Sequence, residues 1–176
     1  KLSKHLKKSF NDLPEDKNEK SKGFYFRLRR FTKLTFKNNK FLSDKNTKFY
    51  QSKKINRFAG GKIRKFSPIN QNILKELKQL IKKNFLTMLP NNKNISIGIH
   101  QIRIRCGTEF VGYPVPEGWH SDGFNYVVLL NVDSKNITGG ITRIKFQKSM
   151  YDVYSVFLKS KEFIFLNDSI YNHYTD

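Results

Sequence analysis

Cysteine is almost absent from this sequence, as are several other features that mark particular classes of protein. The one cysteine, Cys106, excludes an internal disulfide and a cysteine-based zinc site, and it fits a reducing compartment. No apolar run of about eighteen residues occurs, so we expect no membrane-spanning helix. The amino terminus lacks the apolar stretch of a secretory signal peptide. These features together predict a cytoplasmic protein.

Acidic residues are also scarce. The chain has 14 Asp and Glu residues and 34 Lys and Arg residues, which give a net charge of +20. Such a charge is typical of nucleic-acid or anionic-surface binders. It also fits a compositional bias spread along the whole chain, since Arg, which suits bidentate phosphate contacts, is far rarer than Lys. We favour the bias, and we keep nucleic-acid binding as an alternative.

The length and apolar content predict a packed globule. A chain of 176 residues with 38% hydrophobic residues and 16 Phe is long enough to bury a substantial core. We expect a single domain over residues 1–176, in which 1–94 form a supporting region of helices and strands. Residues 95–176 then form the core of the domain.

The hydrophobic pattern indicates a mainly β fold with flanking helices. Ser67 and Pro68 have the residue types of a helix N-cap and first helical position. The expected elements are a short basic helix within 1–13, strands at 24–31, 33–36 and 40–42 with a tight turn at Asn38-Asn39, a helix from 67 to Pro90, and β segments from 95 onward, at 124–132, 141–146, 151–158, 163–166 and 170–173. Many short strands separated by turns favour a jelly roll, the cupin-like double-stranded β-helix.

A polar row follows Ile95, Ile97 and Ile99 on the strand predicted to begin at 95. Gln101, Arg103 and Arg105 continue the parity of those three isoleucines. This row fits either a ligand cavity inside a barrel or a solvent-facing row after a bulge. The sequence alone does not choose between them.

The most informative stretch is His120-x-Asp122, which runs directly into the apolar segment 124–132. Residues i and i+2 of a strand point to the same face, so both side chains could hold one metal ion. A second His would complete the two-His-one-carboxylate set of non-haem Fe(II) oxygenases, and His173 follows a β-rich segment. Each residue also has a simpler interpretation: a surface-loop His, an Asp-Gly turn and a tail His. His100 is the competing imidazole, and we expect it to be packed.

Several motifs in order resemble one bacterial family, the 2-oxoglutarate/Fe(II)-dependent dioxygenases that include L-isoleucine and other free-amino-acid hydroxylases. The motifs are His100-Gln-Ile-Arg103, Pro114-x-Pro-Glu-Gly-x-His120-x-Asp122-Gly, Asn136-Ile-x-Gly139-Gly140 and Asn167-Asp168 followed by His173, with Phe26-Arg-Leu-Arg-Arg-Phe31, Tyr50-Gln51-Ser52 and Gly60-Gly61-x-x-Arg64 upstream. The resemblance covers most of residues 13–176.

The resemblance implies a jelly-roll fold and an enzyme that hydroxylates an unactivated C–H bond of a small substrate. It also implies His120, Asp122 and His173 as the ligands of Fe(II), with 2-oxoglutarate as cosubstrate and O2 as oxidant. The expected partner is therefore a small molecule, with a free L-amino acid as the favoured substrate and no membrane involved.

One feature departs from the family. These enzymes normally hold the distal carboxylate of 2-oxoglutarate with an Arg on the strand after the second His, and the chain ends at Asp176, before that strand. We expect a truncation here. The available substitutes in cosubstrate binding are Arg103, Arg105 and Arg143, together with Gln101 of the polar row, because a carboxylate needs a forked guanidinium or amide donor. The alternatives are a non-catalytic basic jelly roll that binds nucleic acid, and a dioxygenase that acts on a macromolecule.

Overall fold

The computed structural model describes residues 2–20, 25–44, 48–90 and 94–176. Within it the chain forms two compact units. The amino-terminal unit consists of Ser3–Phe49 and Arg64–Arg103, and the carboxy-terminal unit is built from Tyr50–Ile63 and Ile104–Asp176. Neither unit is a single continuous segment, since Tyr50–Ile63 contributes to the carboxy-terminal unit. The prediction of one domain with a boundary after residue 94 stays a prediction.

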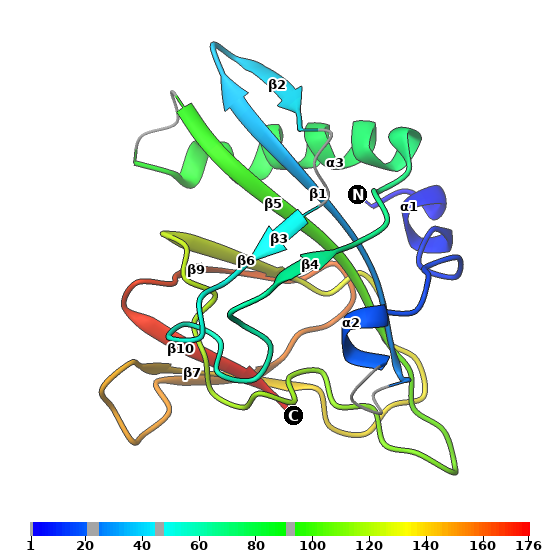
Figure 1. The fold of residues 1–176 in the computed structure, drawn as a ribbon, viewed down its shortest axis with the longest axis vertical. Helices are drawn as coiled ribbons and strands as arrows, with labels where there is room; N and C mark the ends of the chain where they lie inside the picture. The colour runs from blue at the N-terminus through cyan, green and yellow to red at the C-terminus, as the bar shows by residue number, and fades with distance from the viewer. Residues whose placement is uncertain (1, 21–24, 45–47, 91–93) are drawn as a thin grey trace. The chain divides into compact units, whose positions relative to one another are not determined.

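Three strands and the main helix make up most of the amino-terminal unit (Figure 1). The elements are α1 (Lys4–Lys8), α2 (Lys17–Lys20), β1 (Arg27–Lys37), β2 (Lys40–Ser43), α3 (Gln71–Asn84), the 3-10 helix η1 (Leu86–Met88) and β5 (Asn94–Ile104). The sheet has the order β2-β1-β5. Two short strands, β3 (Lys48–Tyr50) and β4 (Ile63–Lys65), pair where the chain passes from one unit to the other.

The hairpin of β1 and β2 confirms the predicted turn at Asn38-Asn39. Both residues have positive φ, 49° and 60°, and Lys37 pairs with Lys40 across a two-residue loop. Asn tolerates this left-handed backbone better than most residues do, and two such residues match the twist of a hairpin. The strand expected at 24–31 instead begins at Arg27 and continues to Lys37, and Phe24 lies outside the described residues.

Helix α3 begins later than the sequence predicts, so the assignment of Ser67 as N-cap is wrong. The N-cap is Asn70, whose side chain accepts a hydrogen bond from the Asn72 amide at 3.0 Å. The segment before it is tied to β1 instead, because Ser67 accepts from the Phe31 amide and Ile69 donates to Thr32 Oγ1, both at 3.0 Å. The predicted end at Pro90 is also wrong, because α3 ends at Asn84 and the 3-10 helix η1 follows it.

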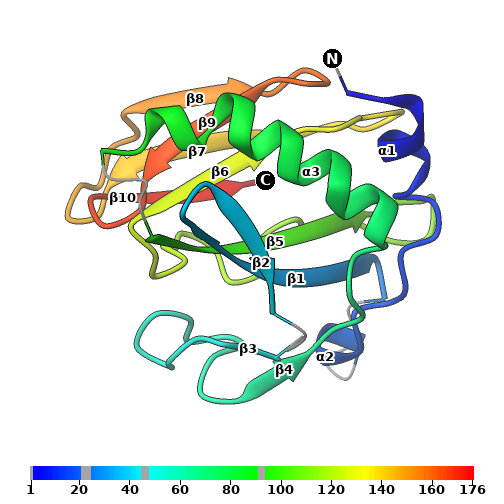
Figure 2. The ribbon, with the colours of Figure 1, turned by 90° about the horizontal axis from the view of Figure 1, so that it is seen from above.

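The apolar face of α3 supplies much of the core of the amino-terminal unit. Ile73, Leu74, Leu77 and Ile81 are buried on one stripe of the helix, the pattern expected of a helix that covers a sheet. Figure 2 shows α3 running along one face of β1 and β5. Another part of the core is an aromatic cluster of Phe31, Phe49 and Phe66.

The carboxy-terminal unit is built from antiparallel β-strands, which confirms the prediction of a mainly β fold. Its strands are β6 (Tyr126–Leu130), β7 (Ile141–Phe146), β8 (Tyr154–Phe157), β9 (Phe163–Asn167) and β10 (Tyr171–Thr175). They form one sheet of order β10-β7-β8 and one pair, β6-β9. All five overlap the predicted segments: β7 has the predicted bounds, β6 and β8 are shorter, and β9 and β10 end later than predicted. Within the described ranges, none of the helices has both the length and the apolar character needed to cross a bilayer.

His100 is packed within the aromatic core, as expected. Its ring stacks on Phe31 with centroids 4.5 Å apart, and it meets Phe49 edge-on at 4.9 Å. Arg29 donates to His100 Nδ1 through Nε at 3.1 Å. Burial holds the pKa of His100 well below its usual value, and the charges of nearby arginines, first Arg29, lower it further. The imidazole is therefore neutral in the folded protein at pH 7.

We predict that His100 makes folding stability depend on pH. The unfolded chain protonates this residue below about pH 6.5, whereas the folded chain does not, so its contribution is complete above that pH and declines as the pH falls. Urea unfolding of the metal-free protein at about pH 7.5 and about pH 5.5 measures the difference. His100→Gln keeps a side-chain oxygen that can accept from Arg29. Its free energy of unfolding should fall less between the two pH values than that of the wild type. An equal loss in His100→Gln and the wild type would contradict this assignment.

Candidate metal centre

Two histidines far apart in the sequence face each other in the carboxy-terminal unit. The His120 amide donates to the carbonyl of His173 at 3.2 Å, and the His173 amide donates to the carbonyl of His120 at 2.8 Å. This reciprocal pair is an isolated antiparallel bridge, and it fixes both Cβ atoms on neighbouring backbone positions. The two ring centroids consequently lie 4.3 Å apart.

Asp122 lies next to both imidazoles. One of its carboxylate oxygens is 3.9 Å from His120 Nε2, and the other is 3.9 Å from His173 Nε2. One ligand atom from each of the three residues lies within 4.8 Å of the others, so the group could hold a metal ion. Two ligand atoms that each lie about 2.1 Å from one metal ion, at right angles, are about 3 Å apart. Modest side-chain rotations would bring the three ligand atoms to that separation. The structure thus brings together the three residues that the sequence predicted.

The side-chain hydrogen bond of His120 uses Nδ1 and leaves Nε2 available to a metal ion. Its Nδ1 is 2.9 Å from the carbonyl oxygen of Gly118, which can only accept. In the neutral imidazole the proton therefore lies on Nδ1, and Nε2 carries the lone pair. Gly118 itself has a φ of +76°, a backbone conformation that glycine adopts without strain.

His173 is held neutral by its surroundings. Its side chain is 4% exposed, and burial is the main reason that its pKa is lowered. The neighbouring His120 lowers the pKa further, while Asp122, Asp168 and Glu117 oppose the shift. A metal needs a deprotonated imidazole nitrogen, so the electrostatics of the site suit a ligand role.

A buried carboxylate, Asp168, fastens the loop that carries Asp122. It is 1% exposed and accepts hydrogen bonds from the backbone amides of Asp122, Gly123 and Phe124 at 3.1, 2.8 and 2.9 Å. The sequence places Asn167-Asp168 in a family motif but does not identify this function of Asp168. An acidic residue directly after an apolar strand, shortly before a candidate ligand, was the available signal.

A second set of polar side chains holds Asp122 from the segment Tyr50–Ile63. Gln51 is 5% exposed and donates from Nε2 to the backbone carbonyl of Asp122 at 2.9 Å. Asn56, also buried, donates to Gln51 at 3.5 Å and to Glu117 at 3.4 Å. The Tyr50-Gln51-Ser52 motif thus contributes to the candidate site through Gln51, which the sequence did not identify as a site residue.

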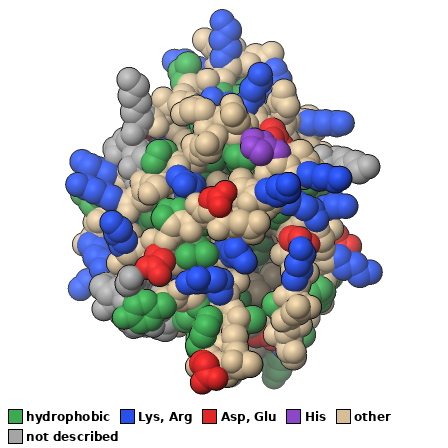
Figure 3. Space-filling view, turned by 90° about the vertical axis from the view of Figure 1, so that its right-hand side faces the viewer, with side chains coloured by type: hydrophobic (Ala, Val, Ile, Leu, Met, Phe, Trp, Pro, Cys, Tyr) green, Lys and Arg blue, Asp and Glu red, His purple; other side chains and the backbone are tan. Residues whose placement is uncertain are grey.

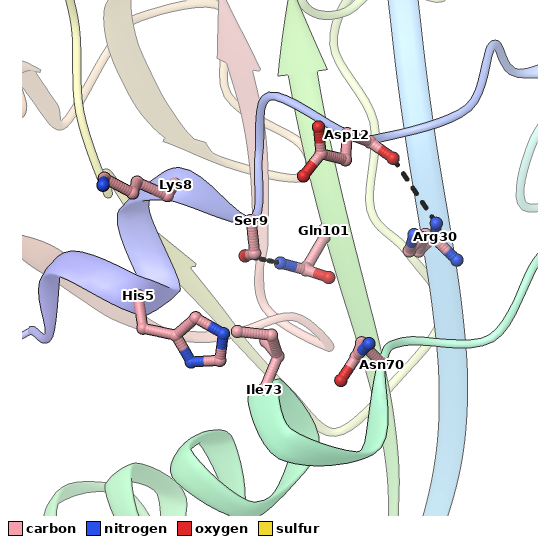
Figure 4. A pocket seen from close by; sticks show the side chains of 8 residues that line it. All are labelled: His5, Lys8, Ser9, Asp12, Arg30, Asn70, Ile73 and Gln101. Carbon is pink, nitrogen blue, oxygen red and sulfur yellow. Dashed lines mark hydrogen bonds between the residues drawn. The ribbon is translucent and has the colours of Figure 1, made fainter.

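Two of the predicted cosubstrate residues belong to the amino-terminal unit. Gln101 is 3% exposed and donates to Ser9 Oγ at 2.9 Å, and Arg103 donates to Asn11 Oδ1 at 3.3 Å. Gln101 lies at the wall of a cavity of about 160 Å³ (Figure 4). The cavity is lined by His5, Lys8, Ser9, Asp12, Arg30, Asn70, Ile73 and Gln101. The side chain of Gln101 is therefore shielded from solvent, and its role in cosubstrate binding stays a prediction.

The other two predicted residues, Arg105 and Arg143, belong to the unit that contains the three candidate ligands. Arg105 is exposed. Arg143 on β7 forms ion pairs with Asp152 at 3.3 Å and Asp176 at 3.8 Å. His173 pairs with Ile144 in the register of β10 and β7, so strand alternation places Arg143 and His173 on opposite faces of the sheet. The cosubstrate assignment of both arginines stays a prediction.

The geometry defines a β protein with a candidate two-His-one-Asp metal centre, and the comparisons with known proteins agree with it. A model of the 2OG-Fe dioxygenase family matches residues 7–176. The chain belongs to this family.

Solved structures show the same fold. A bsmA homologue from Methylobium petroleophilum PM1 superposes with a TM-score of 0.77 at 23% identity, over 97% of this chain and 70% of that one. IDO from Bacillus thuringiensis gives a TM-score of 0.76 at 18% identity, over 97% and 72% of the two chains. Comparison with the curated proteins finds no match.

We predict that two glycines of the site loop differ in their response to alanine. Gly118 and Gly123 both have positive φ, 76° and 82°, so either alanine incurs about 1–2 kcal/mol of backbone strain. A Cβ at Gly118 would meet nothing within 4 Å, whereas a Cβ at Gly123 would lie 2.5 Å from Ile55 Cδ1. Urea unfolding should therefore show a greater destabilisation for Gly123→Ala than for Gly118→Ala.

The double variant Ile55→Ala/Gly123→Ala separates the two effects. Removing the Ile55 side chain should reduce the cost of Gly123→Ala to that of Gly118→Ala, measured as a double-mutant cycle. Equal costs for both single alanine variants would refute the close packing of Gly123 against Ile55.

Proposed function

We propose that the protein is an Fe(II)- and 2-oxoglutarate-dependent hydroxylase whose metal ligands are His120, Asp122 and His173. The observation that carries the proposal is the convergence of these three side chains within one unit, with their ligand atoms within 4.8 Å of one another. Two neutral imidazoles and one carboxylate are the donor set of non-haem Fe(II) oxygenases. The residues present therefore fit the metal that the family implies.

The fold assignment is part of the same proposal. Antiparallel sheets β10-β7-β8 and β6-β9, with the two histidines joined by a backbone bridge, support a double-stranded β-helix. In such a fold the ligands lie on the inner face of strands. The buried positions of His173, Ile144 and Thr142 on one face of β10 and β7 support that arrangement.

When bound, iron supplies the oxidative decarboxylation of 2-oxoglutarate to succinate and CO2, with O2 as oxidant and hydroxylation of a C–H bond as the outcome. The protein chain supplies the geometry. His120 presents Nε2 because its Nδ1–H donates a hydrogen bond to the carbonyl of Gly118. Gln51 and Asp168 hold the backbone of Asp122 through hydrogen bonds. Three protein ligands on one side leave the other coordination positions open for the cosubstrate and O2.

We favour a small substrate, with a free L-amino acid as first choice, over a macromolecule. The side chains of His173 and His120 are only 4% and 11% exposed, so a reacting group must reach a largely shielded metal position. On the face shown in Figure 3, Lys and Arg side chains are spread among acidic, apolar and other side chains. That distribution supports compositional bias as the source of the charge.

We predict that the protein forms succinate from 2-oxoglutarate only with Fe(II) and O2, in the presence of a suitable amino acid. Asp122→Ala removes one of the three ligands and should reduce succinate formation by more than about 100-fold, because loss of even an outer-shell partner costs about 10–100-fold. Asp133→Ala is the matched control, since Asp133 is an exposed carboxylate of the same unit. Equal succinate formation by Asp122→Ala and the wild type would refute the site.

The competing function makes a different prediction. A nucleic-acid-binding protein of this charge should bind single-stranded or duplex probes with an affinity that falls steeply as salt rises. Binding of that kind, together with no turnover of 2-oxoglutarate by iron-loaded protein, would favour the non-catalytic alternative. Turnover of 2-oxoglutarate stimulated only by a nucleic acid or a protein would instead favour a macromolecular substrate.

A further inference from the structure

The Asp168 carboxylate faces two of the proposed ligands at once. One side of it holds the backbone of the Asp122 loop through three amide hydrogen bonds, at 2.8 to 3.1 Å. On another side, Asp168 Oδ1 lies 3.9 Å from His173 Nδ1. The side chain of Asp168 has no exposed surface, so its carboxyl group lies in a low-dielectric position, where backbone donors hold it.

The nitrogen of His173 that faces Asp168 is buried and, in the part of the chain that the structure describes, makes no hydrogen bond. A buried polar nitrogen without a partner costs about 1–3 kcal/mol. A movement of about 1 Å would bring Nδ1 within hydrogen-bonding distance of Oδ1. Asp168 is thus placed to accept a proton carried by Nδ1 of His173.

A second carboxylate competes for the proton of this imidazole. Asp122 lies 3.9 Å from His173 Nε2, the same distance that separates Asp168 from Nδ1. The side chain of Asp122 is 33% exposed, so solvent screens its attraction, whereas that of Asp168 is fully buried. An unscreened charge at equal distance attracts more strongly. The balance therefore favours the tautomer with the proton on Nδ1.

We propose that Asp168 is a positioning residue that selects the Nδ1–H tautomer of His173 and so leaves the lone pair of Nε2 toward the metal position. The inference rests on the proposed function for the identity of the ligands. Ligand histidines generally donate their second ring nitrogen to a carboxylate or carbonyl, and His120 already does so to Gly118. Asp168 would then orient His173 through its ring and Asp122 through its backbone.

Asp168→Asn tests the proposal because it changes the tautomer preference with little change in size. The amide oxygen can still accept from Gly123 and Phe124, whereas an amide N–H directed at His173 favours an unprotonated Nδ1. An orienting Asp replaced by Asn is known to leave a histidine in the wrong tautomer. The 15N NMR spectrum of the metal-free protein with labelled histidines shows which ring nitrogen of each imidazole is protonated, at a fixed pH of about 7.5.

We expect His173 to carry its proton on Nδ1 in the wild type and on Nε2 in Asp168→Asn. His120, held by Gly118, should keep its Nδ1 proton in both proteins, which separates a tautomer change from a general loosening of the site. Co(II) titrated alone should bind Asp168→Asn about 10–100-fold more weakly than the wild type. Asp133→Asn, which alters an exposed carboxylate of the same unit, should match the wild type in both measurements.

A neutral His173 protonated on Nε2 in the wild type would overturn the inference. The wild-type spectrum gives this test even if Asp168→Asn does not fold. Unchanged Co(II) affinity in a folded Asp168→Asn would also overturn it while leaving the proposed metal site intact. Failure of the wild type to bind Co(II) or Fe(II), with the expected tautomer observed, would refute the proposed function instead.

Discussion

The reciprocal pair of backbone hydrogen bonds between His120 and His173 is the contact on which the candidate site depends. It joins the loop before β6 to β10, two segments that are distant in the sequence, at 3.2 and 2.8 Å. Backbone hydrogen bonds fix the positions of both Cβ atoms irrespective of what the side chains bind. The two imidazoles therefore meet because of the strand arrangement, and Asp122 joins them because it is two residues after His120.

The acidic residues near this contact are notable in a chain that has few of them. Of the 14 Asp and Glu residues in a protein of net charge +20, Glu117, Asp122 and Asp168 act on the pKa of His173. Two of them also hold a neighbour: Glu117 accepts a hydrogen bond from Asn56, and Asp168 accepts from the Asp122 loop. Burial lowers the pKa of His173 in spite of these charges, which favours the neutral state that a metal ligand requires. The site thus places carboxylates beside a neutral nitrogen donor.

The sequence was sufficient for the three candidate ligands, because His120-x-Asp122 is a local pattern and His173 follows a β-rich segment. It was also sufficient for most strands and for the Asn38-Asn39 turn, where the signal again lies within a few residues. It failed at the start of α3, since Ser67 and Ile69 bond to β1, a tertiary contact that overrides a good local N-cap. It also missed Gln51 and Asp168, whose roles depend on contacts that no spacing in the chain reveals. The cosubstrate cation was not resolved for the same reason, because a candidate such as Arg143 can be judged only from strand register and partners.

The candidate site requires three side chains to share one metal ion, and anaerobic titration with Fe(II) measures whether they do. We predict that the wild type binds one Fe(II) per chain and that His173→Ala, remote in the sequence from the other two ligands, loses most of this affinity. His5→Ala, which removes an exposed imidazole of the amino-terminal unit, should bind Fe(II) as the wild type does. Equal Fe(II) affinity in His173→Ala and the wild type would contradict the account.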